Sequence, residues 1–295
     1  RAWLDKKETP PIPGKRISVL SNNRSIQADP SLKNVQILLP RPTPNDSWPQ
    51  AGGYANHAIH HIEVRDSLEK KWSTNIGEGN DTDNRLSSEP VIGGGKVFAM
   101  DSGSAITALN FNTGNRVWHL NLTPKDEDDG HIGGGLAYDN GILYVTTGFA
   151  KVFALDAENG KLIWKKKLEA PLRAPPTVRG GRVFVITVNN QMVTLNSETG
   201  EDLWKHSGLP ETASMLGSAS PAVDDGIVIA PYSSGQLVAL RVDNGRVLWE
   251  ESLTSIRQAN AISAISDIRG RPIIDRGLVI AISNGGQIIA VNLRT

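Results

Sequence analysis

The stretch DAENGKLIW, residues 156–164, is one of four near-copies of a single phrase in this chain. NFNTGNRVW precedes it at residues 110–118, and NSETGEDLW and RVDNGRVLW follow it at residues 196–204 and 241–249. In every copy a glycine stands four residues before a tryptophan, and the successive tryptophans are 46, 40 and 45 residues apart. A period of this length is the signature of a protein built from stacked structural repeats.

A second line of sequence precedes each phrase and extends the repeat to five copies. In the copy at residues 176–207, PTV, RVFVIT, MVTLN and EDLWKHS are typical of strands, and RGG, VNNQ and SETG separate them as turns. Four antiparallel strands in a repeat of this length make up one blade of a β-propeller. A single sheet cannot bury both of its faces, so blades stack radially and cover one another. The sequence therefore predicts an all-β β-propeller of four-stranded antiparallel blades.

The repeated glycine and tryptophan have separate predicted roles. Asp or Asn followed by Gly forms a tight turn between the third and fourth strands, because glycine readily adopts positive φ. The tryptophan lies on the outer strand, where an indole ring is large enough to wedge between neighbouring sheets. One further tryptophan stands 46 residues before Trp118, the tryptophan of the first phrase, and closes an earlier, divergent repeat. The predicted structural tryptophans are Trp72, Trp118, Trp164, Trp204 and Trp249.

The two ends of the chain differ from the repeats. Residues 1–45 are predicted to be an N-terminal tether and lead-in segment, because their first part is polar, contains three prolines and lacks an initial methionine. Residues 46–295 are predicted to form the propeller, which is incomplete at its C-terminus because the last repeat stops before its glycine and tryptophan. Since propellers must close, we expect a fragment holding about five to six blades of a longer protein.

Composition excludes several classes of function. The chain has no cysteine, which excludes disulfides, Cys-ligated zinc and a thiol nucleophile. Lys plus Arg and Asp plus Glu number 31 each, so the formal net charge is zero and no nucleic-acid partner is indicated. His57, His60 and His61 are metal-ligand types, but no helical pattern places them on one face. We interpret them as part of a lead-in loop packed on the first blade, and we expect no metal.

The repeated phrase resembles that of propellers related to pyrroloquinoline quinone (PQQ) enzymes over roughly residues 68–295. More narrowly, WSTNIGEG at residues 72–79 and the line after it resemble the first blade of the BamB family, lipoprotein subunits of the outer-membrane β-barrel assembly machinery. The resemblance implies eight blades in the full protein, and a periplasmic location at the inner face of the outer membrane of a Gram-negative bacterium. It implies membrane attachment only through an N-terminal lipid anchor missing from this chain. The implied partners are the barrel-forming subunit and unfolded outer-membrane proteins, with no catalysis and no cofactor.

In the family that this chain resembles, two loops carry partner binding. One has the pattern Leu-x-Leu-Arg, of which EAPLRAPP keeps Leu172 and Arg173 and replaces the first leucine by alanine. The other has Asp-x-Asp, of which SDIRG keeps Asp267 and has Arg269 at the second position. We expect an exposed leucine beside an arginine, as in an interface anchor. The alternatives are an ordinary loop in which the arginine caps carbonyls, and salt bridges within the cluster of Asp267, Arg269 and Arg271.

Two other functions stay open beside a non-catalytic assembly scaffold. A PQQ-dependent dehydrogenase needs a calcium site of carboxylate and amide oxygens and an Asp base beside the quinone. The repeats of 40–46 residues lack the long insertions that build such a pocket. A propeller scaffold of another kind, such as a sensor ectodomain, needs neither group. We therefore predict a non-enzymatic binding protein.

Overall fold

The computed structural model describes residues 29–79, 86–125, 133–210, 219–253, 268, 270–284 and 286–295. The chain divides into two compact units, Arg1–Arg41 and Pro42–Thr295. The described part of the first unit contains one short 3-10 helix, η1 (Pro30–Leu32). Its N-terminus is capped by the Asp29 carboxylate, which accepts a hydrogen bond from the Ser31 N–H at 2.8 Å.

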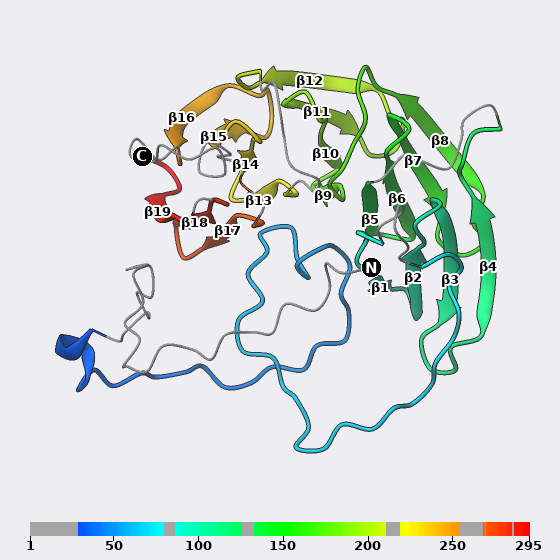
Figure 1. Cartoon of the computed structure of the whole chain (residues 1–295), viewed down its shortest axis with the longest axis horizontal. Coiled ribbons are helices and arrows are strands. Elements are labelled where there is room, and N and C mark those ends of the chain that lie inside the picture. Colours follow the sequence, from blue (N-terminus) through cyan, green and yellow to red (C-terminus); the bar gives the residue numbers. More distant parts are fainter. Residues whose placement is uncertain are drawn as a thin grey trace, which may run out of the picture. The chain divides into compact units, whose positions relative to one another are not determined.

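In the second unit, antiparallel strands pair in chain order to form five sheets (Figure 1). Sheet 1 comprises β1 (Val91–Gly93), β2 (Lys96–Met100), β3 (Ala105–Asn110) and β4 (Arg116–Asn121). Sheet 2 comprises β5 (Gly134–Asp139), β6 (Ile142–Thr147), β7 (Lys151–Asp156) and β8 (Leu162–Lys167). Sheet 3 comprises β9 (Thr177–Arg179), β10 (Arg182–Ile186), β11 (Gln191–Asn196) and β12 (Asp202–Ser207).

Sheet 4 repeats the same arrangement with β13 (Ala222–Asp224), β14 (Ile227–Pro231), β15 (Gln236–Arg241) and β16 (Val247–Ser252). Sheet 5 has three strands among the described residues, β17 (Ile273–Asp275), β18 (Leu278–Ile282) and β19 (Ile288–Asn292). The prediction of an all-β fold built from four-stranded antiparallel sheets is therefore confirmed.

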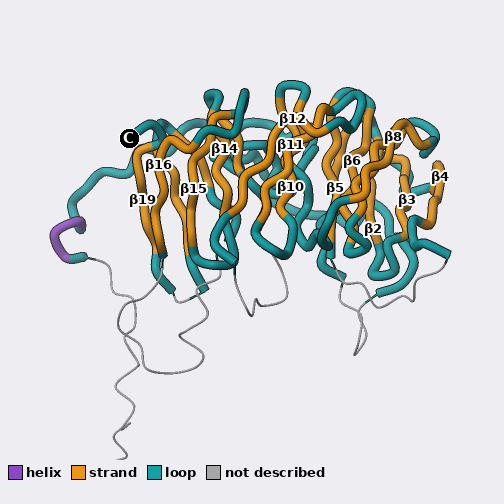
Figure 2. The backbone as a smooth tube through the Cα atoms, turned by 90° about the horizontal axis from the view of Figure 1, so that it is seen from above, coloured by secondary structure: helices purple, strands orange, loops and turns teal. Residues whose placement is uncertain are grey.

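The five sheets follow one another around an arc, with the first strand of each sheet at the centre and the fourth at the rim (Figure 1). The first strands of consecutive sheets are in contact, which fixes the order of the sheets. Figure 2, turned by 90°, shows the strands of successive sheets running side by side in a similar direction. Sheets 2, 3 and 4 therefore each present one face to the sheet before and the other to the sheet after, as expected for radially stacked repeats.

The first hairpin of every sheet closes through a two-residue turn in which both residues have positive φ. A loop with this geometry is a type I′ turn, whose twist matches the twist of the flanking strands. Glycine occupies the second position of every pair, as the GG and NG signals in the sequence predict. The pairs are Gly94–Gly95, Asn140–Gly141, Gly180–Gly181, Asp225–Gly226 and Arg276–Gly277.

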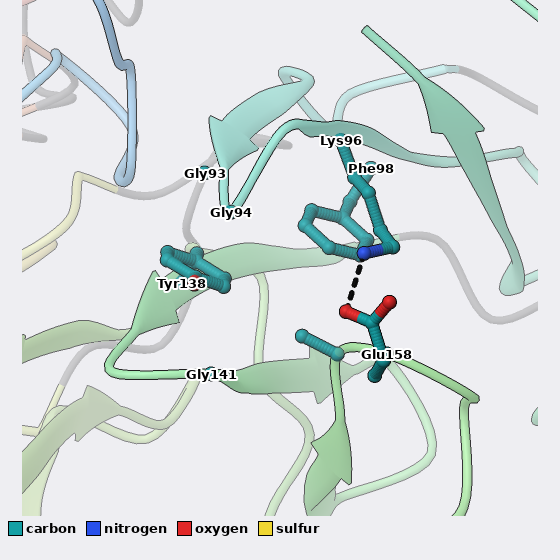
Figure 3. A pocket seen from close by; sticks show the side chains of 8 residues that line it. Gly93, Gly94, Lys96, Phe98, Tyr138, Gly141 and Glu158 are labelled. Carbon is teal, nitrogen blue, oxygen red and sulfur yellow. Dashed lines mark hydrogen bonds and ion pairs between the residues drawn. The ribbon is translucent and has the colours of Figure 1, made fainter.

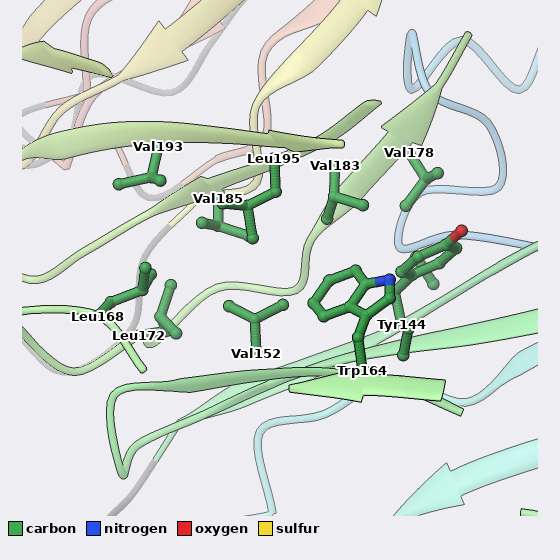
Figure 4. Packing of buried hydrophobic residues seen from close by; sticks show 12 residues of the cluster. Tyr144, Val152, Trp164, Leu168, Leu172, Val178, Val183, Val185, Val193 and Leu195 are labelled. Atoms are coloured by element: carbon green, nitrogen blue, oxygen red, sulfur yellow. The ribbon is translucent and has the colours of Figure 1, made fainter. Parts of the chain in front are cut away.

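Apolar side chains fill the space between consecutive sheets, and Figure 4 shows the core between sheets 2 and 3. Val183 and Val185 of β10 point into this core, whereas Phe184 and Ile186 of the same strand belong to the core between sheets 3 and 4. Alternation along one strand thus supplies two separate cores, since successive side chains point to opposite faces. The inner strands of sheets 2, 3 and 4 are buried on both faces for this reason.

The five predicted structural tryptophans lie between consecutive repeats, and we call each contact a tryptophan clasp. In every clasp the indole Nε1–H donates a hydrogen bond to a backbone carbonyl of the next repeat. The acceptors are Phe111 O for Trp72 (3.0 Å), Ala157 O for Trp118 (3.0 Å), Ser197 O for Trp164 (2.8 Å), Val242 O for Trp204 (2.9 Å) and Leu293 O for Trp249 (2.9 Å).

The glycine of the next repeat lies directly against the indole ring in four of these clasps. A Cβ atom placed on Gly200 would lie 2.6 Å from the ring of Trp164, closer than real side chains approach. The same residue has a φ of 72°, which disfavours any other side chain. The repeated glycine thus serves both the turn and the clasp. Equivalent close approaches join Gly114 to Trp72, Gly160 to Trp118 and Gly245 to Trp204.

Candidate functional site

The loop between sheets 2 and 3 contains the predicted partner-binding pair. The structure corrects the expectation that Leu172 is exposed, because its side chain is 0% exposed and packs in the core between the two sheets (Figure 4). Its backbone N–H donates to Thr147 O at 3.3 Å, and the residue forms an isolated bridge with Thr187. Leu172 therefore holds the loop onto the sheets and is not available as an interface anchor.

Arg173, the next residue, is half-buried and remains the candidate contact residue of this loop. The loop backbone lies close to the chain that leads into sheet 2. A Cβ on Gly133, which has a φ of 129°, would lie 2.8 Å from Arg173 Cα. The backbone at the arginine thus packs closely against the chain that leads into sheet 2.

Asp267 and Arg269, the second predicted pair, lie outside the described residues. Ile268 between them is buried in the core between sheets 4 and 5. Arg271, the third member of this charged cluster, pairs through its guanidinium with Glu89 at 2.8 Å. Glu89 lies two residues before β1, so this ion pair links the last described sheet to the first.

The most extensive contact that sequence reasoning missed involves residues 48–57, which we call the hub segment. It crosses the inner strands of all five sheets and accepts a hydrogen bond from the equivalent backbone N–H of each one. Along the segment, Trp48 O accepts from Ile92 N (2.8 Å), Pro49 O from Tyr138 N (2.7 Å), Gln50 Oε1 from Val178 N (2.9 Å), Ala55 O from Val223 N (2.7 Å) and Asn56 O from Ile274 N (2.9 Å). The lead-in segment therefore packs on the first sheet through Trp48, as expected, and also on the four sheets after it, while His57 contacts sheet 5 and not the first sheet.

Gln50 makes the only side-chain contribution to this series of five bonds. Its amide is 6% exposed and pairs with Val178 twice, because Nε2 also donates to Val178 O at 2.7 Å. The side chain thus imitates the backbone of a neighbouring strand. A turn follows directly, in which the Gly53 N–H donates to Gln50 O at 2.8 Å and the glycine lies beneath the Trp48 ring.

Two of the three histidines attach the end of the hub segment to sheet 5. His57 is buried, and its Nδ1 lies 2.8 Å from Pro272 O. Burial lowers the pKa of His57 to about 4, and the nearby Arg271 contributes in the same direction. His60 is exposed and its Nε2 lies 2.9 Å from the Asp275 carboxylate. Among the described residues, no group of three or more His, Asp or Glu side chains is placed to hold a metal ion.

A second group of buried titratable side chains lies between sheets 3 and 4. The Tyr232 hydroxyl is 2.7 Å from His206 Nδ1, and the two rings stack. Burial raises the pKa of Tyr232 and lowers that of His206. These shifts come from packing between sheets, and both groups have hydrogen-bond partners, so the pair is explained by structure alone.

The cavities among the described residues differ in size and character. A cavity of about 60 Å³ between sheets 1 and 2 is lined by Gly93, Tyr138 and the buried Lys96 (Figure 3). The Lys96 ammonium pairs with the Glu158 carboxylate at 2.5 Å across its mouth. This space is too small for an organic ligand. An open groove of about 840 Å³ lies along residues 62–71, against Phe111.

Comparisons with known proteins place this chain among assembly factors. The family model described as outer membrane protein assembly factor BamB matches residues 62–131 and 102–295. An uncharacterised protein of Rickettsia conorii is 35% identical over 210 residues, which cover 70% of this chain and 50% of that protein. Outer membrane protein assembly factor BamB of Yersinia pestis is 28% identical over 240 residues, which cover 79% of this chain and 61% of that protein.

Solved structures share the fold at low sequence identity. BamB from Moraxella catarrhalis superimposes with a TM-score of 0.61 at 22% identity, over 74% of this chain and 65% of that one. A europium-containing methanol dehydrogenase gives a TM-score of 0.63 at 16% identity, over 84% of this chain and 56% of that one. Within the described residues, no helix is long and apolar enough for a membrane span.

The chain spans about half to three fifths of the length of the curated relatives given above. The family match, in contrast, extends over the divergent repeat around Trp72 and over all five repeats that follow it. The chain therefore belongs to the BamB family of outer-membrane protein assembly factors.

Proposed function

We propose that this chain belongs to a non-catalytic periplasmic scaffold of the outer-membrane protein assembly complex. In this proposal an N-terminal lipid anchor outside the chain attaches the protein to the inner face of the outer membrane. Loops between the sheets bind the barrel-forming subunit and assist the delivery of outer-membrane proteins. The family match across residues 62–295 is the observation that carries the proposal.

The character of the described residues supports a scaffold role. Several of their buried polar groups join one part of the chain to another, as in the tryptophan clasps and the hub segment. The described titratable groups with the largest pKa shifts, His57 and Tyr232, both have hydrogen-bond partners within the packing. A framework joined in this way suits protein binding, because little order is lost on association.

The loop that carries Arg173 is the first candidate for the partner contact. Its backbone is held by the buried Leu172, so the arginine is presented from a fixed position. Arginine is enriched at interface hot spots because its planar guanidinium makes several directed hydrogen bonds. Asp267 and Arg269, in the next loop but one, are proposed as a second contact on the basis of the family pattern.

Recovery of the barrel-forming subunit with the full-length protein tests this proposal. We expect Arg173→Glu to lower recovery about tenfold or more, since reversing an interface charge opposes association. Arg246→Glu is the matched control, because Arg246 is an exposed arginine in the turn before β16. Equal recovery with both variants would exclude this loop as the contact. Failure of the wild-type protein to recover the subunit would favour a scaffold of another kind.

A PQQ-dependent dehydrogenase is the second candidate, favoured only by the likeness to methanol dehydrogenase, which shows the fold alone. Such an enzyme holds calcium and the quinone with a group of carboxylates. The described residues contain no such group, and the sequence has no cysteine. The described residues therefore do not fit this cofactor. Stoichiometric binding of both calcium and PQQ by the full-length protein would overturn the scaffold proposal.

A further inference from the structure

We propose that residues 56–60, which overlap the end of the hub segment and continue past it, are an acid-released latch that fixes sheet 5 to the hub segment. Two hydrogen bonds from consecutive residues form its buried part. Asn56 O accepts from Ile274 N at 2.9 Å, and His57 Nδ1 lies 2.8 Å from Pro272 O. Both partners belong to the start of sheet 5, so the latch holds this sheet at one edge.

The protonation state of His57 follows from its surroundings. A carbonyl oxygen only accepts hydrogen bonds, so Nδ1 carries the proton and donates to Pro272 O. The imidazole is 4% exposed, and a second proton would place a positive charge where water cannot reach it. His57 is therefore neutral in the closed latch.

The charges that face His57 come from two other parts of the chain. Arg271, beside Pro272, opposes a positive charge on the imidazole, and Glu89, before β1, favours it. These two groups neutralise each other largely through their own ion pair at 2.8 Å. Burial therefore remains the largest influence on His57, and it lowers the pKa from 6.5 to about 4.

The sign of the pH effect follows from these values. When the latch opens, the imidazole is hydrated and its pKa returns to about 6.5, so the open state binds the proton more readily. Acidification below pH 6.5 then favours opening, and the effect is complete below pH 4. At pH 5.5 the ratio of open to closed latch is roughly tenfold higher than at neutral pH.

The outer part of the latch is exposed to solvent. His60 Nε2 lies 2.9 Å from the Asp275 carboxylate, and Arg276 Nε also lies 3.8 Å from that carboxylate. Exposed contacts of this kind contribute little to stability. The buried histidine therefore determines the direction of the switch.

Hydrogen exchange measured by NMR on the full-length protein tests the latch. The reporter is the Ile274 amide, and the internal reference is the Val178 amide, which the same hub segment holds through an uncharged side chain. We expect opening at Ile274 to rise roughly tenfold relative to Val178 between pH 7.5 and 5.5, after correction for intrinsic exchange rates.

His57→Asn is the critical variant, because the Asn amide places a donor near the position of Nδ1 and stays neutral at every pH. Asn also tolerates the left-handed backbone at this position, where φ is 59°. We expect the variant to abolish the pH response, and His60→Asn, the matched control, to retain it. An unchanged response in His57→Asn, or no response in the wild-type protein, would overturn the proposal.

A direct titration of the histidine rings by NMR needs no variant. We expect the ring of His57 to titrate well below 6.5. If His57 titrates at or above 6.5, the latch is not released by acid. None of these outcomes depends on the barrel-forming subunit, so this inference and the proposed function fail independently.

Discussion

At the scale of single residues, one glycine position serves two constraints in four of the repeats. Gly200 has a φ of 72° and lies against the ring of Trp164. The Nε1–H of the same tryptophan donates to Ser197 O, three residues before Gly200. A side chain at this glycine strains the backbone and also displaces the indole. The strength of the repeated phrase as a sequence signal comes from this double requirement.

We expect Gly200→Ala to lower the free energy of unfolding by about 2–4 kcal/mol, because it combines left-handed backbone strain with overpacking against the indole. Gly226→Ala is the matched control: its φ of 74° is similar, but nothing lies within 4 Å of the added Cβ. We expect the control to cost about 1–2 kcal/mol from strain alone. Urea denaturation of the two variants measures the difference, and equal losses would contradict the clasp.

At the scale of elements, the hub segment supplies what the inner strands lack. The first strand of each sheet has an unpaired edge that faces the centre of the arc, and unpaired backbone groups are costly once buried. Five acceptors along residues 48–56 meet five equivalent N–H groups in the order of the sheets. A single extended segment thereby connects elements that are far apart in sequence.

We expect Gln50→Ala to lower the free energy of unfolding by about 2–4 kcal/mol, because it leaves the buried N–H and C=O of Val178 without partners. Gln191→Ala is the control, since the amide of Gln191 makes only a 3.5 Å contact with Ser207 Oγ. The control is expected to change stability by less than about 0.5 kcal/mol. Denaturant unfolding followed by tryptophan fluorescence compares the two, and a mild effect of Gln50→Ala would show that the hub segment contributes little.

At the scale of the whole second unit, the two faces of sheet 5 are not equivalent. One face packs on sheet 4 through Ile274, Val279 and Ala281. The other face carries large apolar side chains without cover among the described residues, Ile273, Leu278, Ile280, Ile282 and Ile288, with Ile288 68% exposed. The equivalent residues of sheet 4, Ala222, Ile227, Ile229 and Leu237, are all buried. Because the chain spans only part of the length of its relatives, we propose that further repeats cover this face in the full protein.

We expect Ile280→Glu in the full-length protein to cost about 3 kcal/mol or more, as Ile229→Glu in sheet 4 would, because both charges become buried between sheets. Leu162→Glu, on the exposed outer strand β8, is the control and should be tolerated. Thermal unfolding distinguishes these outcomes. Tolerance of Ile280→Glu would mean that solvent, and no further repeat, meets this face.

The sequence by itself determined the repeat, the turns, and the position of each tryptophan and its glycine. These features are fixed by interactions within one repeat or between neighbours, so they recur at a constant spacing. The anchoring of the chain by Gln50, the burial of Leu172 and the pair of Arg271 with Glu89 leave no such periodic trace. Gln50 and Val178 are 128 residues apart, and Arg271 and Glu89 are 182 apart. Only the tertiary structure decided these three features, because each contact occurs once and depends on where the stacking of sheets brings distant segments together.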